Sequence, residues 1–227
     1  MAFIWICLYY LTHLAAENFV PPVGNSRLFS AMALLLYTGS LFLWLFRSGR
    51  AETIRLCRIR TSKKSAVLAA AMLLLFPLYN CLTAAYLETN FSAILLTFCV
   101  CAAEEVFFRG FLLQYLKRYG IKASIIISSV IFAVYHLGNY SAVPDMMFVS
   151  FQTLSAFSAG MCYAVSIALL DSIVPCILAH FLTNLTADPS AVPEIQLQLL
   201  GLCIGLSCFF CICFFKDIKK YRYDKGE

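Results

Sequence analysis

Charged side chains are scarce in this chain of 227 residues, since Asp, Glu, Lys and Arg together make up only 13%. Soluble domains carry about a quarter of charged residues, so the polar surface needed to coat a globule of this length in water is missing. Hydrophobic residues reach 62%, and the mean hydropathy is +0.83. The shortage of charge therefore excludes an ordinary soluble domain and indicates an integral membrane protein that has the lipid bilayer as its solvent.

Internal repeats, low-complexity tracts and flexible linkers do not stand out either, so we expect one membrane domain over residues 1–227. The apolar runs are rich in Leu, Ala and Phe and lack the alternation of a transmembrane β-barrel. Because backbone groups in lipid must be bonded internally, the predicted fold is all-α, a polytopic membrane bundle of about eight transmembrane helices. The apolar stretches lie at residues 2–16, 28–46, 66–87, 91–116, 123–138, 146–170, 172–187 and 195–215.

Two common signatures of hydrolases are absent from the sequence. No serine lies in a nucleophile elbow, and no H-E-x-x-H motif occurs. The cysteines number eleven, an odd count, and most lie inside apolar runs, where a free cysteine packs as a small hydrophobe. A cysteine nucleophile is compatible with the sequence, but Cys101 and Cys176 have no positional argument beyond packing.

The basic residues are distributed unevenly along the chain. Fifteen of the seventeen Lys and Arg residues lie in the segments 47–64, 117–122 and 216–227. If eight helices alternate with both termini in the cytoplasm, all fifteen face the cytoplasm, as the positive-inside rule requires. Because these charges sit at helix ends, anionic lipid headgroups account for them, and we expect no nucleic-acid partner.

Three of the predicted membrane helices contain clustered polar residues that hydrocarbon disfavours. A charge at the bilayer centre costs about 2.5–3.5 kcal/mol on insertion scales, so such side chains usually face the bundle interior and have a function. Singly, each has a structural explanation, such as an interhelical hydrogen bond. Together they are confined to three helices: Glu104, Glu105 and Arg109 in 91–116, His136 in 123–138, and His180 and Asn184 in 172–187.

The spacing of these residues along each helix predicts which of them lie on the same helix face. Glu105 and Arg109 are i,i+4 neighbours and can pair, whereas Glu104 is rotated from Glu105 by about 100° and can point elsewhere. His180 and Asn184 are also i,i+4 neighbours on one face.

The polar residues of the three helices are expected at similar depths in the membrane. Glu104 and His136 each lie about 20 Å along their helices from the basic segment 117–122 that joins them. His180 and Asn184 lie about 12–18 Å from the start of their helix on the same side. One constellation inside the membrane is therefore geometrically feasible.

The chemistry of such a constellation leaves several functions open. A carboxylate beside an imidazole is a general acid/base pair, and a histidine with an amide can donate hydrogen bonds to an oxyanion. These groups suit amide hydrolysis by activated water. Buried Glu and His residues also relay protons in transporters, and a non-catalytic membrane scaffold is a third alternative. Two histidines and two carboxylates can bind zinc, although we expect a site without a metal or cofactor.

Three motifs in this order resemble the CPBP family, the CAAX proteases and bacteriocin-processing enzymes also called the Abi family. They are Glu104-Glu105-Val106-Phe107-Phe108-Arg109, Phe132-Ala133-Val134-Tyr135-His136 and His180-Phe181-Leu182-Thr183-Asn184. The resemblance covers about residues 91–187, the expected catalytic core. It implies that Glu104 activates water with help from His136, that His180 and Asn184 form the oxyanion hole, and that Glu105 and Arg109 support the site.

This resemblance implies an intramembrane glutamic endopeptidase that cuts a membrane-associated peptide or protein, with the site opening toward the cytoplasmic half. The lack of extra domains resembles bacterial members, so a bacterial plasma membrane is the expected location. Some members of the family act through partners, which keeps a scaffold or a bacteriocin-immunity protein as the alternative to an enzyme. The substrate and the oligomeric state stay open at this point.

Overall fold

A computed structural model describes residues 8, 26–49, 62–83, 87–141, 146–187 and 194–223. These residues form helices and no strand, which confirms the all-α prediction. The predicted stretch at 2–16 lies outside the described residues except for Leu8. The elements are α2 (Ser26–Arg47), α3 (Lys63–Thr83), α4 (Phe91–Glu105), the π-helical η2 (Val106–Leu112), α5 (Leu113–Leu116), the 3₁₀ turn η3 (Lys117–Tyr119), α6 (Ile121–Tyr135), the 3₁₀ segment η4 (His136–Ser141), α7 (Met146–Leu170), α8 (Val174–Leu185) and α9 (Glu194–Tyr223).

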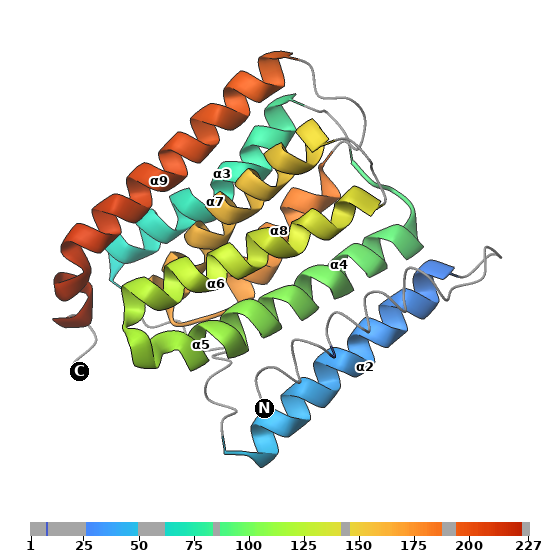
Figure 1. The fold of residues 1–227 in the computed structure, drawn as a ribbon, viewed down its shortest axis with the longest axis horizontal. Helices are drawn as coiled ribbons and strands as arrows, with labels where there is room; N and C mark the ends of the chain where they lie inside the picture. Colours follow the sequence, from blue (N-terminus) through green and yellow to red (C-terminus); the bar gives the residue numbers. More distant parts are fainter. Residues whose placement is uncertain are drawn as a thin grey trace.

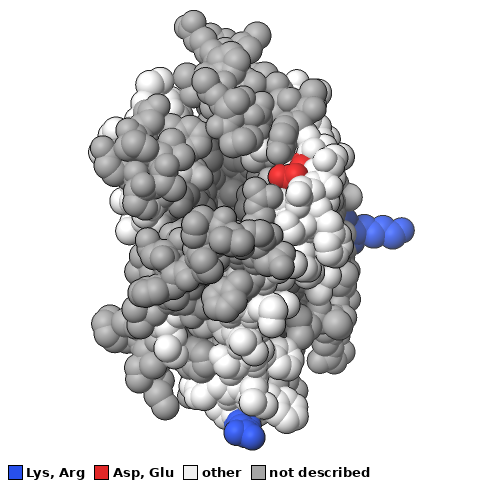
Figure 2. All heavy atoms as spheres, turned by 90° about the vertical axis from the view of Figure 1, so that its right-hand side faces the viewer, with Lys and Arg blue, Asp and Glu red and all other residues white. Residues whose placement is uncertain are grey.

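Five of the described helices are long and apolar enough to cross a membrane, and two shorter apolar helices cover Val174–Leu185 and Leu200–Lys216. Large apolar side chains such as Leu36 and Leu82 are exposed on the surface, where lipid rather than water suits them. The described surface visible in Figure 2 is mostly uncharged. The chain is thus an integral membrane protein, while the number of eight helices stays a prediction.

The helices pack side by side, with α7 at the centre of the bundle (Figure 1). In α7, 72% of the membrane-spanning window Val149–Leu170 is buried, and the helix contacts α3, α6 and α9. Small residues such as Ala156 and Ala159 are among its buried positions. The blue α2 helix lies at the edge of the bundle against α4 (Figure 1).

A long helix built of four elements runs from Phe91 to Tyr119 and carries the first motif. It begins at Asn90, whose side chain accepts hydrogen bonds from the backbone N–H groups of Ser92 and Ala93. It ends at Gly120, which has a φ of 95° that an L side chain rarely adopts. Between these ends, residues directly after the paired glutamates form the wider π-helical turn of η2. Such turns are rare and frequently occur at functional sites.

Candidate active site

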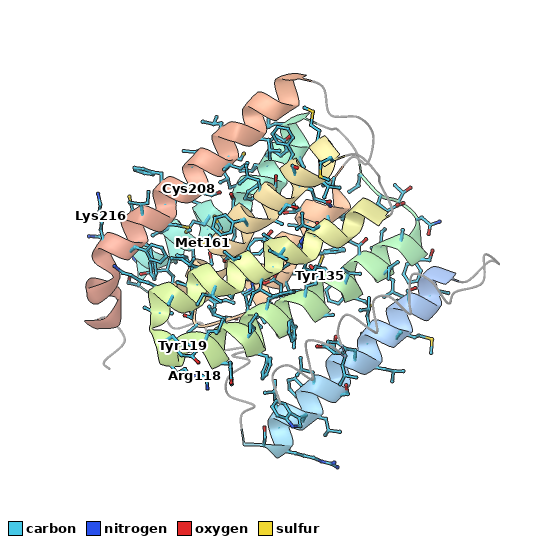
Figure 3. The ribbon with its side chains drawn as sticks, in the orientation of Figure 1. Arg118, Tyr119, Tyr135, Met161, Cys208 and Lys216 are labelled. Carbon is cyan, nitrogen blue, oxygen red and sulfur yellow. The ribbon has the colours of Figure 1, made fainter. Side chains whose placement is uncertain are left out.

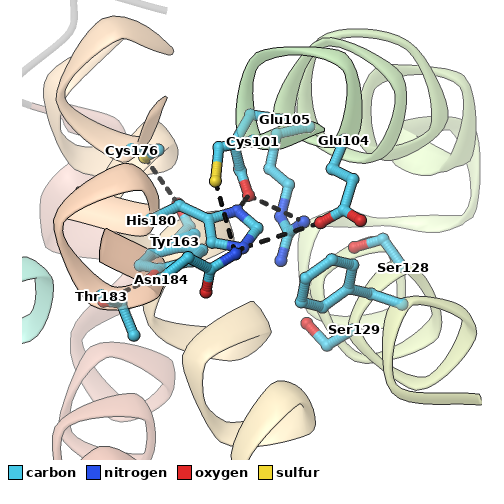
Figure 4. A network of polar contacts seen from close by, with 12 residues as sticks. Cys101, Glu104, Glu105, Ser128, Ser129, Tyr163, Cys176, His180, Thr183 and Asn184 are labelled. Atoms are coloured by element: carbon cyan, nitrogen blue, oxygen red, sulfur yellow. Dashed lines mark hydrogen bonds and ion pairs between the residues drawn. The ribbon is translucent and has the colours of Figure 1, made fainter. Parts of the chain in front are cut away.

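Glu105 links the helix that carries it to α8 through His180 (Figure 4). Its Oε1 atom lies 3.1 Å from Nη1 of Arg109, one helical turn along the same helix. The same oxygen accepts a hydrogen bond of 2.9 Å from Nδ1 of His180 on α8. The side chains of Glu105 and Arg109 are 0% and 1% exposed, so this ion pair is sealed from solvent. The pairing expected from the i,i+4 spacing is present, and the contact with His180 adds a link between α4 and α8.

Aromatic rings surround the guanidinium of Arg109. Its Cζ atom lies 4.0 Å from the ring centre of Phe132, 5.5 Å from that of Tyr163 and 5.7 Å from that of Phe108. Within the described part of the chain, Nη1 and Nη2 have no hydrogen-bond acceptor in suitable geometry. The positive charge is therefore stabilised by the Glu105 carboxylate and by the negative faces of the rings.

Gly160 on α7 makes room for this arrangement. A Cβ atom at this position would lie 3.1 Å from Nη2 of Arg109 and 3.2 Å from Cδ1 of Phe132. Both distances are shorter than ordinary van der Waals contacts, so a side chain here would push the arginine or the ring aside. Sequence reasoning missed this glycine, because nothing in the sequence shows which residue of α7 faces Arg109.

Glu104 points to a different part of the same cluster of polar groups. Its Oε2 atom lies 3.6 Å from Nε2 of His180, and its side chain is 5% exposed. The two nitrogens of one imidazole thus face two successive carboxylates, Nδ1 toward Glu105 and Nε2 toward Glu104. The rotation of about 100° between neighbouring helical residues produces this separation.

Asn184 lies one helical turn after His180 and adds an amide to the same group of polar side chains. Its Nδ2 atom lies 3.3 Å from Nε2 of His180 and donates a hydrogen bond of 3.4 Å to Sγ of Cys101. Cys101 is fully buried and lies three residues before Glu104, so both residues are on neighbouring faces of α4. The sequence predicted only a packing role for Cys101, but its thiol also accepts a hydrogen bond from Asn184. The i,i+3 spacing of Cys101 from Glu104 was the feature of the sequence that could have placed it near the site.

His136 stands at the point where α6 ends and η4 begins. Its Nδ1 atom lies 2.9 Å from the backbone carbonyl of Phe132, and since a carbonyl can only accept, Nδ1 carries the hydrogen. In the neutral ring, Nε2 therefore has the lone pair and can accept a proton. The ring centre of Phe132 lies 4.8 Å from that of His136 and 5.8 Å from that of His180, which places the two histidines in one neighbourhood.

Two residues on neighbouring helices contact α8 and hold it in place. Tyr163 on α7 packs its ring 5.6 Å from the ring of His180, and its hydroxyl lies 3.5 Å from Oγ1 of Thr183. Asn80 on α3 donates a hydrogen bond of 2.7 Å to the backbone carbonyl of Thr183. Tyr163 and Asn80 lie outside the sequence motifs, and only the packing of α3 and α7 against α8 reveals their role.

The structure brings five of the six predicted site residues into one connected network, and the sixth, His136, packs against the same Phe132 ring as His180. In the described part of the chain, no three His, Cys, Asp or Glu side chains are arranged to hold a metal ion together. The network offers a carboxylate, two imidazoles and an amide, which are the groups for moving a proton and for binding an oxyanion.

Residues 86–186 match the family model described as Rce1-like, type II CAAX prenyl endopeptidase Rce1-like. The matched range includes the six polar residues from Glu104 to Asn184. No curated protein and no solved structure gives a significant match to the chain.

Proposed function

We propose that this chain, whose residues 86–186 belong to the Rce1-like family of type II CAAX prenyl endopeptidases, hydrolyses a peptide bond by means of water that Glu104 activates. The family is one of intramembrane proteases. One observation supports Glu104 as the residue that activates water: the two successive glutamates have different partners. Glu105 is engaged with Arg109 and Nδ1 of His180, whereas Glu104 faces Nε2 of the same imidazole.

Glu104 fits the role of the general base. A carboxylate that takes a proton from water must lie near other polar groups, so that the water is held in place before the attack. Glu104 lies 3.6 Å from Nε2 of His180, and the Phe132 ring packs against the rings of both His180 and His136. In this proposal His136 helps to hold the water through Nε2, because its Nδ1 is already bonded to the Phe132 carbonyl.

His180 and Asn184 fit the role of the oxyanion hole. When the ring is protonated on both nitrogens, Nδ1 donates to Glu105 and Nε2 presents its hydrogen toward the outer part of the site. The Asn184 amide has two hydrogens, of which one goes to Cys101. Its second hydrogen and the Nε2 hydrogen come from atoms 3.3 Å apart, close enough to share one negatively charged oxygen in the transition state.

Glu105 and Arg109 support this arrangement without touching the substrate. The Glu105 carboxylate fixes the orientation of the His180 ring, as a buried carboxylate does for the histidine of a hydrolytic triad. Arg109 balances the charge of Glu105 inside the membrane, where an unpaired carboxylate would be costly. Within this proposal the substrate is a membrane-associated peptide or protein, and residues 91–187 form the catalytic core of the chain.

The test is cleavage by the purified protein in lipid vesicles, with secreted peptides of an expression host as the substrate pool and H₂¹⁸O as the solvent. We expect internal cuts whose new carboxyl ends carry ¹⁸O, both with and without a chelator. Cleavage should disappear in folded Glu104→Gln protein. Wild-type activity in that variant contradicts the proposed base, and loss of activity on chelation indicates a metal-dependent reaction instead.

A further inference from the structure

We propose that Asn80 is a positioning residue, which holds the last turn of α8 so that the Asn184 amide stays aligned for the reaction. Asn80 acts through the backbone carbonyl of Thr183, to which its side chain donates a hydrogen bond of 2.7 Å. The inference rests on the proposed role of Asn184 in the oxyanion hole. It adds a residue from α3, a helix that lies outside the range 86–186 of the family match.

Asn184 lies where a helix by itself gives little support. It is the next-to-last residue of the 12-residue α8, and it is exposed. The last four carbonyls of an α-helix have no N–H partner within the helix, so helix ends fray unless other groups bind these carbonyls. Because a displacement of about 1 Å in a catalytic site can cost about 10²-fold in rate, the alignment of Asn184 needs contacts from outside α8.

Two neighbouring segments supply such contacts at the end of α8. Asn80 binds the carbonyl of Thr183, and the backbone N–H of Glu88 binds the carbonyl of Leu185 over 3.2 Å. Thr183 and Leu185 directly flank Asn184 in the chain. Helix α3 also packs against both α7 and α8, and side chains fill the space between these helices (Figure 3). The residue that carries the amide is thus held from both sides.

The bond from Asn80 acts directly on the backbone of Asn184. The carbonyl of Thr183 and the Cα atom of Asn184 belong to one peptide group, which is planar. Fixing this oxygen therefore restricts the direction in which the Asn184 side chain projects toward Nε2 of His180, 3.3 Å from Nδ2. The Thr186 hydroxyl also lies 3.4 Å from the Thr183 carbonyl oxygen, but Thr186 directly follows α8 and cannot tie it to another helix.

Thr183 is held at its side chain as well (Figure 4). Its hydroxyl donates a hydrogen bond of 2.9 Å to the backbone carbonyl of Ala179. The hydroxyl oxygen can then only accept, and the Tyr163 hydroxyl lies 3.5 Å away as the donor. Two helices, α3 through Asn80 and α7 through Tyr163, therefore fix the residue that precedes Asn184.

The surroundings of Asn80 allow a positioning role to be separated from a purely structural one. Asn80 is 9% exposed and lies in the part of α3 that is long and apolar enough to cross the membrane. Interhelical hydrogen bonds in membranes contribute little to global stability on average. Leucine at this position should therefore let the protein fold, while it removes the donor from the Thr183 carbonyl.

Hydrogen exchange in lipid tests the role of Asn80 without requiring any cleavage. In Asn80→Leu, we expect the backbone amides of residues 184–186 to exchange about tenfold faster than in the wild type, because a carbonyl that loses its buried partner destabilises the last turn. The unfolding temperature in lipid should stay close to that of the wild type. Ser65→Ala, which changes a buried polar residue near the start of the same helix, is the matched control and should leave this exchange unchanged. Wild-type exchange at 184–186 in Asn80→Leu overturns the proposal.

Kinetics connect this alignment to the reaction. Asn80→Leu should lower kcat about tenfold with KM unchanged, which is less than the loss of about 10²–10³-fold expected when Asn184→Ala removes the oxyanion donor. In the Asn184→Ala background, Asn80→Leu should cause no further loss, because no amide is left to position. An equal loss in both backgrounds overturns the proposal. If the wild-type protein cuts no peptide, the proposed function fails, and the exchange measurement alone decides whether Asn80 holds the end of α8.

Discussion

The site has two halves that differ in how their charges are surrounded. In the inner half, Glu105 and Arg109 are sealed from solvent and pair with each other under a ring of aromatic side chains. The outer half is formed by Glu104, His136 and Asn184. His136 and Asn184 lie near helix ends and are at least partly accessible, whereas Glu104 lies in the middle of the long helix and is buried. One step along a helix separates the two glutamates, yet it gives them different surroundings. We therefore assign stabilisation to the inner half and reaction to the outer half.

The largest effect on activity is expected from Glu104→Gln. Glutamine keeps the shape of the side chain but cannot take a proton from water, so the cleavage rate per folded molecule should fall about 10²–10⁴-fold. Unfolding in lipid should change little. The matched control is Glu88→Gln, outside the site, where the side-chain oxygen can still accept from the backbone N–H of Asn90. If the Glu104→Gln protein cleaves peptides at the same rate as this control, the two halves of the site do not have the different roles assigned here.

Glu105→Gln should act mainly on stability. It leaves the charge of Arg109 without its carboxylate in a dry interior, which typically costs about 3–5 kcal/mol. We expect less folded protein and a lower unfolding temperature in lipid. Adding Arg109→Met removes the orphaned charge and packs an apolar chain against Phe132, so the double variant should recover folded protein. If Glu105→Gln alone unfolds at the wild-type temperature, the inner half does not have the assigned role.

Gly160→Ala tests the inner half from the side of α7. The added methyl group would lie 3.1 Å from Nη2 of Arg109 and 3.2 Å from the Phe132 ring, and such overpacking costs about 1–3 kcal/mol. Thermal unfolding in lipid measures the loss. Gly39→Ala on α2 is the control, because no atom lies within 4 Å of a Cβ there. Equal stability of the two variants would show that Arg109 tolerates displacement.

The smallest effect is expected at Cys101, which belongs to the outer half through its contact with Asn184. Cys101→Ala removes the acceptor that holds the amide, and a hydrogen bond contributes about 1 kcal/mol net. This corresponds to a fall in kcat of roughly fivefold, with KM unchanged. Cys101→Ser restores an acceptor and should restore the rate. A loss that serine does not rescue would indicate that the thiol acts through packing alone.

Much of the fold follows from the sequence, because apolar runs in lipid have few alternatives to helices. The run at 91–116 appears as one long helix, and the short run at 172–187 appears as the 12-residue α8. The π-helical turn of η2 could not be predicted, since its residues have the same apolar composition as the α-helical turns beside them.

The site was predictable where contacts lie within one helix. The spacing of Glu105 from Arg109, and of His180 from Asn184, is enough to place each pair on one face. Contacts between helices depend on rotation and depth, which spacing does not give. For this reason the bond between Glu105 and His180, the space left by Gly160 and the contact of Cys101 appear only in the folded structure.

The central claim is that the inner half of the site stabilises the protein and the outer half carries the reaction. It is tested most directly by measuring cleavage per folded molecule in lipid for two proteins, Glu104→Gln and the Glu105→Gln, Arg109→Met double variant. In the double variant, the amide oxygen of the new glutamine can still accept from Nδ1 of His180, and Glu104 keeps its carboxylate. The account predicts that the double variant retains measurable cleavage while Glu104→Gln has lost it. A folded double variant as inactive as Glu104→Gln, or an active Glu104→Gln enzyme, would contradict it.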